Sequence, residues 1–235
     1  MPNKFIYKIG RVKQIKIPNS HFLIGQIIGA FAGDGCYSKG KTKRGIKHFI
    51  RFCLSYEKDV DYKNYLFLIF QKMNLNPRVH IKKYRDKLSA FEIRICSIKF
   101  IEFIKNYLYW DDTIGSIQRF KNSKKKTYSV HLKYPLENYS NLFLIGFARG
   151  LMDTDGFVES KGVACGVVSE KLIFNLNDIL IKVGIIPKVT IQNRKFPRKN
   201  LFLLRVSNNN LDNYLNKIGF SNLRKKRELL QILKK

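Results

Sequence analysis

The sequence predicts an α+β fold built from two similar halves, each with the element order helix–strand–strand–helix–strand–strand–helix. Three observations support this prediction. The apolar segment FLIGQIIGAFAGDG, which starts at Phe22, recurs as FLIGFARGLMDTDG, which starts at Phe143. Weaker similarity follows each copy, as in NPRVHI against IPKVTI and FEIRICS against FLLRVSN. In both halves, runs with strand-like alternation lie between segments with helical periodicity.

The first half begins with the apolar segment, which we expect to form a helix. Ser20 suits its N-cap, and Gly35 suits the left-handed position that ends it. The two strands of a hairpin follow, joined by the Lys- and Gly-rich tip SKGKTKRGIKH. The remaining elements are a helix at 62–75, strands at 78–84 and 91–97, and a closing helix at 98–108.

The second half repeats this order, with Asn141 and Gly156 at the equivalent ends of its apolar helix. The shorter run KGVACGVVS belongs to its first two strands. Next come a helix at 170–184, strands at 188–194 and 201–207, a helix at 210–219 and the amphipathic helix NLRKKRELLQILKK. We therefore expect an N-terminal repeat at 1–110, a linker at 111–140 and a C-terminal repeat at 141–235.

Glycines recur at matching positions of the two apolar segments, one turn apart on one helix face. They are Gly25, Gly29, Gly146 and Gly150. Because glycine has no side chain, two helices with such faces can approach backbone to backbone. If the helices pack side by side in parallel, their C-terminal ends meet and bring Asp34 close to Asp155. We therefore predict a central helix pair related by a pseudo-two-fold axis.

Carboxylates at these helix ends need an explanation, since the helix dipole disfavours negative charge there. Two like charges placed close together also raise each other's pKa. A cation removes both penalties, and Mg²⁺ prefers carboxylate oxygens, with water and substrate phosphate completing its shell. Asp34 and Asp155 thus predict a Mg²⁺ site, with Mn²⁺ as a substitute.

The chain is strongly basic, with 45 Lys and Arg against 17 Asp and Glu and a formal net charge of +28. The excess runs along the whole chain, which favours nucleic acid as the partner over an anionic membrane surface or a plain solvated surface. Strand alternation places polar side chains on one face of each sheet. The residues that we expect to contact DNA are Lys47, Arg51, Arg78, His80, Lys82, Arg94, Lys188, Gln192, Arg194 and Arg205.

The segments IIGAFAGDG and ARGLMDTDG resemble the two signature copies of the single-chain LAGLIDADG homing endonucleases. The resemblance implies that antiparallel sheets form a DNA-binding saddle around the central helix pair. It also implies a monomeric, metal-dependent, site-specific double-strand DNA endonuclease, active in intron homing, with a long asymmetric site and short cohesive products.

By position, the resemblance makes Asp34 and Asp155 the catalytic, metal-binding acids, with the backbone carbonyls of Gly33 and Thr154 as additional ligands. The first acid of the signature is Ala32 in one copy and Asp153 in the other. We therefore expect a local structural role for Asp153. The candidates for ordering water and stabilising the transition state are Lys225, Lys133 and Glu170.

Two other functions stay open on the sequence. One is an intron RNA maturase, with intron RNA as a partner, and the other is a DNA-binding protein without catalysis. The four cysteines have no CxxC spacing and are expected to be free, mostly buried thiols. With no signal core in MPNKFIYKIG, we expect a soluble, intracellular protein of the cytoplasm, nucleoid or an organelle matrix. The target DNA sequence does not follow from the chain.

Overall fold

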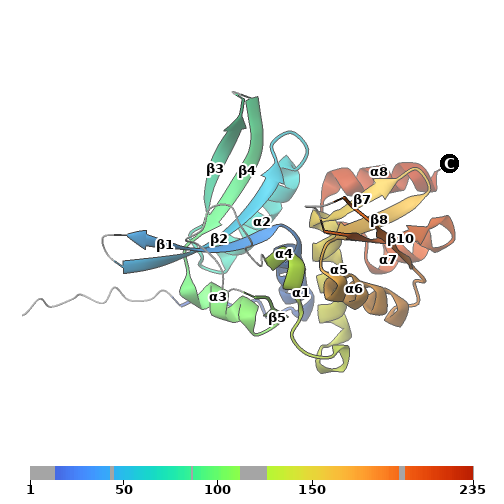
Figure 1. The fold of residues 1–235 in the computed structure, drawn as a ribbon, viewed down its shortest axis with the longest axis horizontal. Coiled ribbons are helices and arrows are strands. Elements are labelled where there is room, and N and C mark those ends of the chain that lie inside the picture. Colours follow the sequence, from blue (N-terminus) through green and yellow to red (C-terminus); the bar gives the residue numbers. More distant parts are fainter. Residues whose placement is uncertain (1–13, 43–44, 86, 112–125, 196–198, 235) are drawn as a thin grey trace, which may run out of the picture.

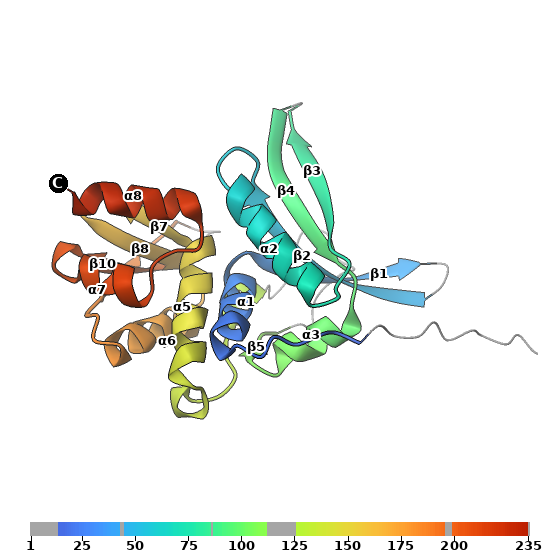
Figure 2. The same cartoon turned by 180° about the vertical axis from the view of Figure 1, so that it is seen from behind.

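The computed structural model describes residues 14–42, 45–85, 87–111, 126–195 and 199–234. Two halves lie side by side, and one long helix from each half stands at the centre (Figures 1 and 2). These helices are α1 (His21–Asp34) and α5 (Asn141–Thr154), formed by the repeated apolar segments. Among the described helices, none is long and apolar enough to cross a membrane.

The first half has the predicted order of elements. After α1 come β1 (Gly35–Thr42), β2 (Gly45–Ser55), α2 (Val60–Lys72), β3 (Arg78–Tyr84), β4 (Lys87–Ile95) and α3 (Ile98–Lys105). All strand pairs are antiparallel, in the order β1-β2-β4-β3. The inner face of this sheet packs on the helices through buried apolar side chains such as Phe52 and Ile93.

The second half repeats this order. After α5 come β7 (Gly156–Glu159), β8 (Gly162–Val167), α6 (Glu170–Lys182), β9 (Lys188–Gln192), β10 (Leu201–Ser207), a 3-10 turn at Asn208–Asn210, α7 (Leu211–Lys217) and α8 (Leu223–Leu233). Its antiparallel sheet has the equivalent order, β7-β8-β10-β9. The α+β class with two αββαββα halves is therefore confirmed. The halves differ in strand length: β1 and β2 have 8 and 11 residues, whereas β7 and β8 have 4 and 6.

The described part of the segment predicted as a linker packs against the core. It contains α4 (Lys126–Ser129), β6 (His131–Leu132) and a 3-10 turn at Leu136–Asn138, and β6 pairs with β5 (Leu108–Tyr109). Val130 and Leu132 are buried. Residues 112–125 of the expected linker lie outside the described residues. Residues 126–140 of the predicted linker are thus packed against the rest of the protein.

Three local expectations are wrong. The N-cap of α5 is Ser140, whose Oγ accepts a hydrogen bond from Phe143 N, while Asn141 is the first helical residue. Gly35 has φ −69°, so the chain leaves α1 in an extended conformation and not through a left-handed residue. Gly156 likewise lacks a positive φ and is the first residue of β7. A side chain at Gly35 would collide with the preceding helical turn at Phe31, which explains the glycine. Of the four cysteines, all free, only Cys165 is buried.

Candidate active site at the paired helix ends

The helices α1 and α5 touch through their backbones. A Cβ atom at Gly25 would collide with the carbonyl oxygen of Phe143, and one at Gly146 would collide with that of Phe22. One turn further along, Gly29 and Gly150 meet the opposite helix in the same way. These reciprocal contacts place the two C-terminal ends next to each other and leave no room for a larger residue at any of the four positions.

Asp34 is the last residue of α1, and Asp155 is the C-cap of α5. Gly33 lies directly against Thr154 and Asp155, so the two helix ends are in contact. Burial, together with the charge of Asp155, raises the pKa of Asp34 to about 7, although Lys225 and Lys126 act in the opposite direction. Burial also raises the pKa of Asp155. The charge on Asp155 therefore makes ionisation of Asp34 less favourable.

Each helix end is capped by a lysine. Lys126 Nζ donates hydrogen bonds to the carbonyl oxygens of Phe31, Ala32 and Gly33, at 2.6, 2.7 and 2.9 Å. Lys225 Nζ donates to the carbonyl oxygens of Met152, Asp153 and Thr154, at 3.2, 2.6 and 2.9 Å. The three acceptors on α1 and the three on α5 occupy equivalent repeat positions, so the two lysine caps follow the pseudo-two-fold axis.

The lysine caps oppose the negative ends of the helix dipoles, where two aspartates would otherwise be most costly. An ammonium group has three N–H donors, and each lysine uses all three on carbonyl oxygens. Burial lowers the pKa of Lys126 to about 8 and also lowers the pKa of Lys225, while the nearby aspartates favour their charged forms. In this state both lysines stabilise the helix ends and have no N–H free for a substrate.

The oxygen atoms at the helix ends fit a hard divalent cation. Among the described residues, no group of three or more His, Cys, Asp or Glu side chains could hold a metal ion. A cation here would therefore take Asp34 and Asp155 as its protein carboxylates, with backbone oxygen, water and substrate completing the shell. The carbonyl oxygens of Gly33 and Thr154 each accept one lysine hydrogen bond, which leaves one lone pair on each.

Asp153 lies just before this end of α5 and points away into a buried polar network. Its Oδ1 accepts hydrogen bonds from the backbone N–H groups of Ser221 and Asn222, at 2.8 and 2.9 Å. Its Oδ2 accepts one from Gln26 Nε2 at 3.2 Å. Burial raises the pKa of Asp153 to about 6 against these donors. Asp153 thus holds the start of α8, the helix that carries Lys225.

The network continues into the N-terminal half. Tyr65 on α2 donates to Gln26 Oε1 at 2.7 Å, and Asn222 Nδ2 donates to Asp59 Oδ1 at 2.9 Å. Arg224 Nη2 also lies 3.6 Å from Asp59 Oδ1. These bonds fix α8 to both halves. This role of Gln26 and Asp59 could not be predicted from the sequence, because neither lies at a repeated position that carries charge.

Two of the residues suggested by the sequence are not brought to the helix ends. Lys133 is exposed, with its ammonium group 5.3 Å from the centre of the Tyr134 ring, and Lys126 occupies the position expected for it. Glu170 is exposed at the first turn of α6, where its carboxylate suits the positive helix end. Nothing in the repeat pattern pointed to Lys126, because it precedes the second apolar segment and has no counterpart at the matching place in the first half.

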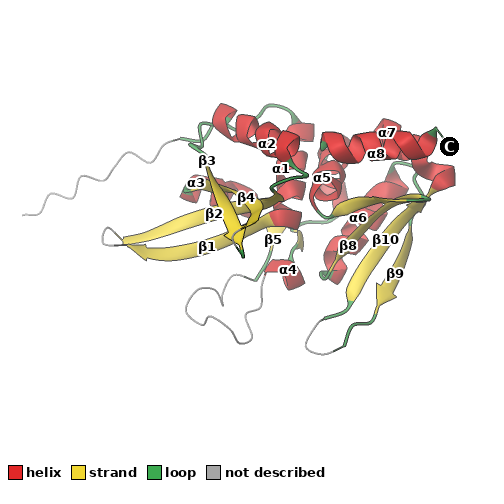
Figure 3. Cartoon of the chain, turned by 90° about the horizontal axis from the view of Figure 1, so that it is seen from above, coloured by secondary structure: helices red, strands yellow, loops and turns green. Residues whose placement is uncertain are grey.

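The strands of both sheets lie on one side of the molecule, with α2, α7 and α8 on the other (Figure 3). Register puts Arg51, Arg94 and Arg78 opposite one another on three adjacent strands of the first sheet. In the second sheet Arg205 lies opposite Lys188. Of the ten residues expected to contact DNA, Arg51 and Arg94 are half-buried and the other eight are exposed. Both sheets thus present cations on the same side.

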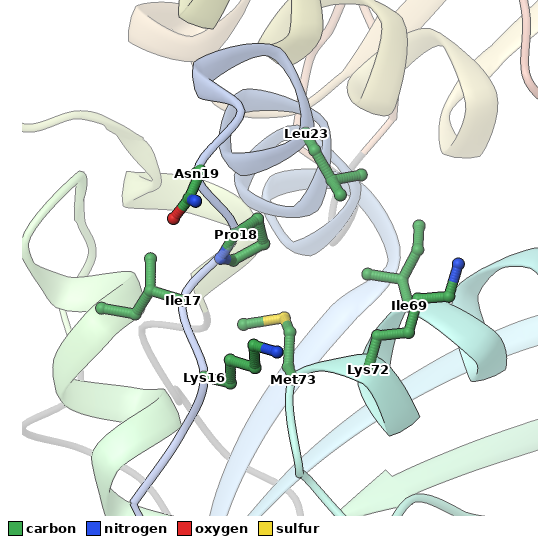
Figure 4. Close-up of a pocket in the computed structure, with 8 residues that line it drawn as sticks. All are labelled: Lys16, Ile17, Pro18, Asn19, Leu23, Ile69, Lys72 and Met73. Carbon is green, nitrogen blue, oxygen red and sulfur yellow. The ribbon is translucent and has the colours of Figure 1, made fainter.

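A separate pocket of about 450 Å³ lies at the opposite end of α1 (Figure 4). Its lining comes from the segment before α1, from α1 itself and from the end of α2: Lys16, Ile17, Pro18, Asn19, Leu23, Ile69, Lys72 and Met73. No carboxylate lines it, and it lies at the other end of α1 from Asp34. It is therefore not part of the candidate active site.

Comparison with known proteins agrees with the fold. Residues 142–219 match a family model described as a LAGLIDADG-like domain. One curated relative is the replication factor C small subunit of Methanocaldococcus jannaschii, 27% identical over 213 residues, which are 90% of this chain and 10% of that protein. The chain therefore spans about a tenth of the length of the curated relative that it matches.

Among solved structures, the chain is similar to I-DmoI in complex with DNA and Ca, with a TM-score of 0.60 and 15% identity over 86% of this chain and 91% of that one. The complex of I-DmoI with DNA and Mn gives a TM-score of 0.59 and 15% identity, over 86% and 98% of the two chains. The homing endonuclease I-WcaI bound to its DNA recognition sequence gives 0.53 and 13%, over 91% and 88%. Identities this low show the fold alone; with the family model, they confirm the resemblance predicted from the two repeated segments.

Proposed function

We propose that this chain, which carries a LAGLIDADG-like domain and has the fold of the LAGLIDADG homing endonucleases, is a site-specific, metal-dependent endonuclease that cuts both strands of duplex DNA. The observation that carries the proposal is the pair of half-buried aspartates, Asp34 and Asp155, at two helix ends in contact. Stability alone does not account for such a pair, because burial and mutual repulsion both act against it.

In the proposed reaction, Asp34 and Asp155 would hold a divalent cation, Mg²⁺ or Mn²⁺. When bound, the cation supplies Lewis-acid stabilisation of charge on the phosphate oxygens. Lys126 and Lys225 keep the two helix ends and their aspartates in place. Water hydrolyses one phosphodiester in each strand and breaks the bond from phosphorus to the 3′ oxygen. Because both aspartates lie at one interface, the two cuts are close together and leave short cohesive ends.

The two sheets provide the DNA-binding surface in this proposal. Arginine and glutamine side chains on their outer faces suit hydrogen bonds to base edges, while lysines suit phosphates. The pseudo-two-fold axis relates the sheets, but their side chains and strand lengths differ. The recognised site is therefore long and asymmetric. One copy of the chain holds both helix ends, so a monomer is sufficient for double-strand cleavage.

The test has two steps. The full chain is first used to select bound duplexes from a randomised library in Ca²⁺. A plasmid with the selected site is then incubated with the protein in Mg²⁺ or in EDTA, and the nicked and linear products are separated. We expect linear product in Mg²⁺ only. Selective binding without cleavage would instead identify a DNA-binding protein. Binding to structured intron RNA without duplex selection would identify a maturase.

A further inference from the structure

The outer face of the first sheet contains a buried acid among its cations. Glu92 on β4 shares this face with Arg94 on the same strand and with Arg51 and Lys82 on the two neighbouring strands. Its side chain is 1% exposed, although the face itself points to solvent. A carboxylate on a surface expected to meet phosphates weakens binding by its charge. The presence of Glu92 on this face therefore needs an explanation other than phosphate binding.

Three cations enclose this carboxylate. Arg94 donates from Nη2 and Nε to Glu92 Oε1, at 2.6 and 3.2 Å. Lys82 Nζ lies 2.5 Å from Glu92 Oε2, and Arg51 Nη1 lies 3.8 Å from the same oxygen. Burial by itself raises the pKa of Glu92, yet the three cations hold it below its ordinary value. Glu92 is thus ionised and paired at neutral pH.

The cations remain partly open to solvent. The side chains of Arg51, Lys82 and Arg94 are 31%, 45% and 39% exposed. Glu92 takes the Nε–Nη2 edge of Arg94, and the Arg94 guanidinium lies 5.8 Å from the centre of the Phe49 ring. Among the described residues nothing else binds the Nη1–Nη2 end of Arg94, which can therefore take a pair of acceptors. A planar guanidinium held along one edge presents its other end in a fixed direction.

We propose that Glu92 is a positioning residue for base recognition: it holds Arg51, Lys82 and Arg94 as one pre-ordered unit and so limits where they contact the DNA. This inference rests on the proposed DNA-binding function. An unpaired arginine or lysine can follow any phosphate, which raises affinity for all sequences alike. A cation paired with Glu92 can reach fewer phosphates. Glu92 therefore increases the preference for one DNA sequence and lowers the affinity for all sequences.

The second sheet offers a contrast within the described residues. Arg205, at the repeat position of Arg94, pairs with Glu159 on the edge strand β7, where Nε lies 3.0 Å from Oε2. The side chains of Arg205 and Glu159 are 45% and 33% exposed, so the pair is open to solvent. A single exposed pair is weak and exchanges readily with water or phosphate. The base pairs under the second sheet should therefore depend little on Glu92.

A purely structural role could also explain the presence of Glu92. Arg51, Arg94 and Arg78 lie opposite one another on three strands, and like charges in that position destabilise a sheet. Glu92 reduces this repulsion whatever the protein binds. A loss of thermal stability in a variant therefore does not separate the two roles, whereas a change in sequence preference does.

The experiment compares the wild-type chain, Glu92→Gln and the control Glu102→Gln in the library selection in Ca²⁺. Glu102 forms an exposed pair with Lys99 on α3, so its change matches in charge but lies outside the sheet. For Glu92→Gln we expect tighter binding to random DNA at low salt. We also expect the preference for the selected base over the other bases to fall about 5- to 150-fold, at base pairs under the first sheet only. A fall of this size corresponds to the loss of one good bidentate contact. Glu102→Gln should keep the wild-type preference.

A second variant keeps the test decisive if Glu92→Gln does not fold. Arg94→Lys retains the charge but cannot form the two-bond contact with Glu92, so it should lose preference at the same base pairs with an unchanged salt dependence. An unaltered preference in either folded variant would overturn the role of Glu92 and leave the proposed function intact. A wild-type chain that selects no sequence would overturn both.

Discussion

The C-terminal ends of α1 and α5 carry the same group of charges but build it in different ways. In both, an ammonium group binds three successive carbonyl oxygens beside an aspartate. The lysine at α1 comes from the short helix α4 before the second repeat, and the lysine at α5 comes from α8 after it. The position of the charge is therefore preserved across the pseudo-two-fold axis, although the element that supplies it differs between the two halves.

The support behind the two lysines also differs. Asp153 binds the start of α8 and links it to Gln26 of the other half, whereas Ala32 occupies the equivalent place in α1. On the sheet side, Cys36 of β1 lies opposite Arg51 at the first end. At the second end the matching pair is Phe157 and Ala164. The two ends are thus alike in their aspartates and lysines and unlike in the residues around them.

The largest expected effect is on cleavage by Asp34→Asn and Asp155→Asn. In the proposed mechanism, removing either carboxylate takes away a ligand of the divalent cation, so double-strand cleavage should fall by about 10²–10³-fold or more in both variants. Specific binding in Ca²⁺ should be largely retained, since the amide preserves size and removes a negative charge near phosphate. Plasmid cleavage beside a gel shift measures both. Nicked plasmid from only one variant would show that the two ends work independently.

The next effect is a pH-dependent gain in stability from Asp34→Asn in EDTA. The pKa of Asp34 is about 7 in the folded chain against an ordinary value of 3.8. Between pH 3.8 and about 7, Asp34 loses its proton in the unfolded chain and keeps it in the folded chain. The free energy of unfolding of the wild type therefore falls as pH rises, whereas that of the asparagine variant does not change through this group. The variant should gain up to about 4 kcal/mol by pH 8 and almost nothing at pH 4. Urea melts at both pH values measure it, and an equal gain at pH 4 would contradict the titration of Asp34.

Gly29→Leu and Gly150→Leu test whether the helix contact is symmetric. In each case the new side chain meets backbone of the other helix, which cannot move aside as a flexible side chain can. We expect losses of about 1–3 kcal/mol or more, similar in the two variants. Gly45→Leu is not a suitable control, because Gly45 has φ +110°; Gly166→Ala, which meets only leucine side chains, is preferable. Unchanged thermal midpoints would rule out the close approach.

Lys126→Met and Lys225→Met compare the two lysine caps directly. Each change leaves three carbonyl oxygens at a negative helix end without their donor, and cleavage should fall by about 10- to 100-fold in both, as for other residues that support metal ligands. Lys133→Met removes the same charge from an exposed position and should leave cleavage within about twofold. Calorimetric titration of Ca²⁺ into the variants gives a second readout. A full loss for Lys225 with none for Lys126 would show that the caps are not equivalent.

The smallest effect is expected from Asp153→Asn. The amide oxygen can still accept the hydrogen bonds from the N–H groups of Ser221 and Asn222, so α8 should stay in place. Substantial cleavage activity should remain, with a change in stability of about 1 kcal/mol. Plasmid cleavage and thermal melts give both numbers. Loss of cleavage as complete as that of Asp155→Asn would give Asp153 a part in the chemistry and not only in holding α8.

Several features followed from the sequence because they are repeated locally. The glycines and the final aspartate recur in two copies, and a recurring small residue on one helix face has few uses other than a close contact. The strand order followed from the alternation of apolar and polar residues. The details at the helix ends did not follow: Gly35 and Asn141 fit common capping patterns, but the neighbouring turn and Ser140 decided the actual geometry.

The α+β fold with two similar halves and the pairing of α1 with α5 could therefore be predicted from the sequence alone, because hydrophobic periodicity and internal repeats can be recognised without knowing which residues meet in space. The lysine that reaches α1 could be identified only from the folded chain, because Lys126 belongs to a segment without a repeat partner and is one of many lysines in a strongly basic chain. The same holds for Glu92. Its environment is created by three strands brought into register, and an acid among scattered cations has no signature until that register forms.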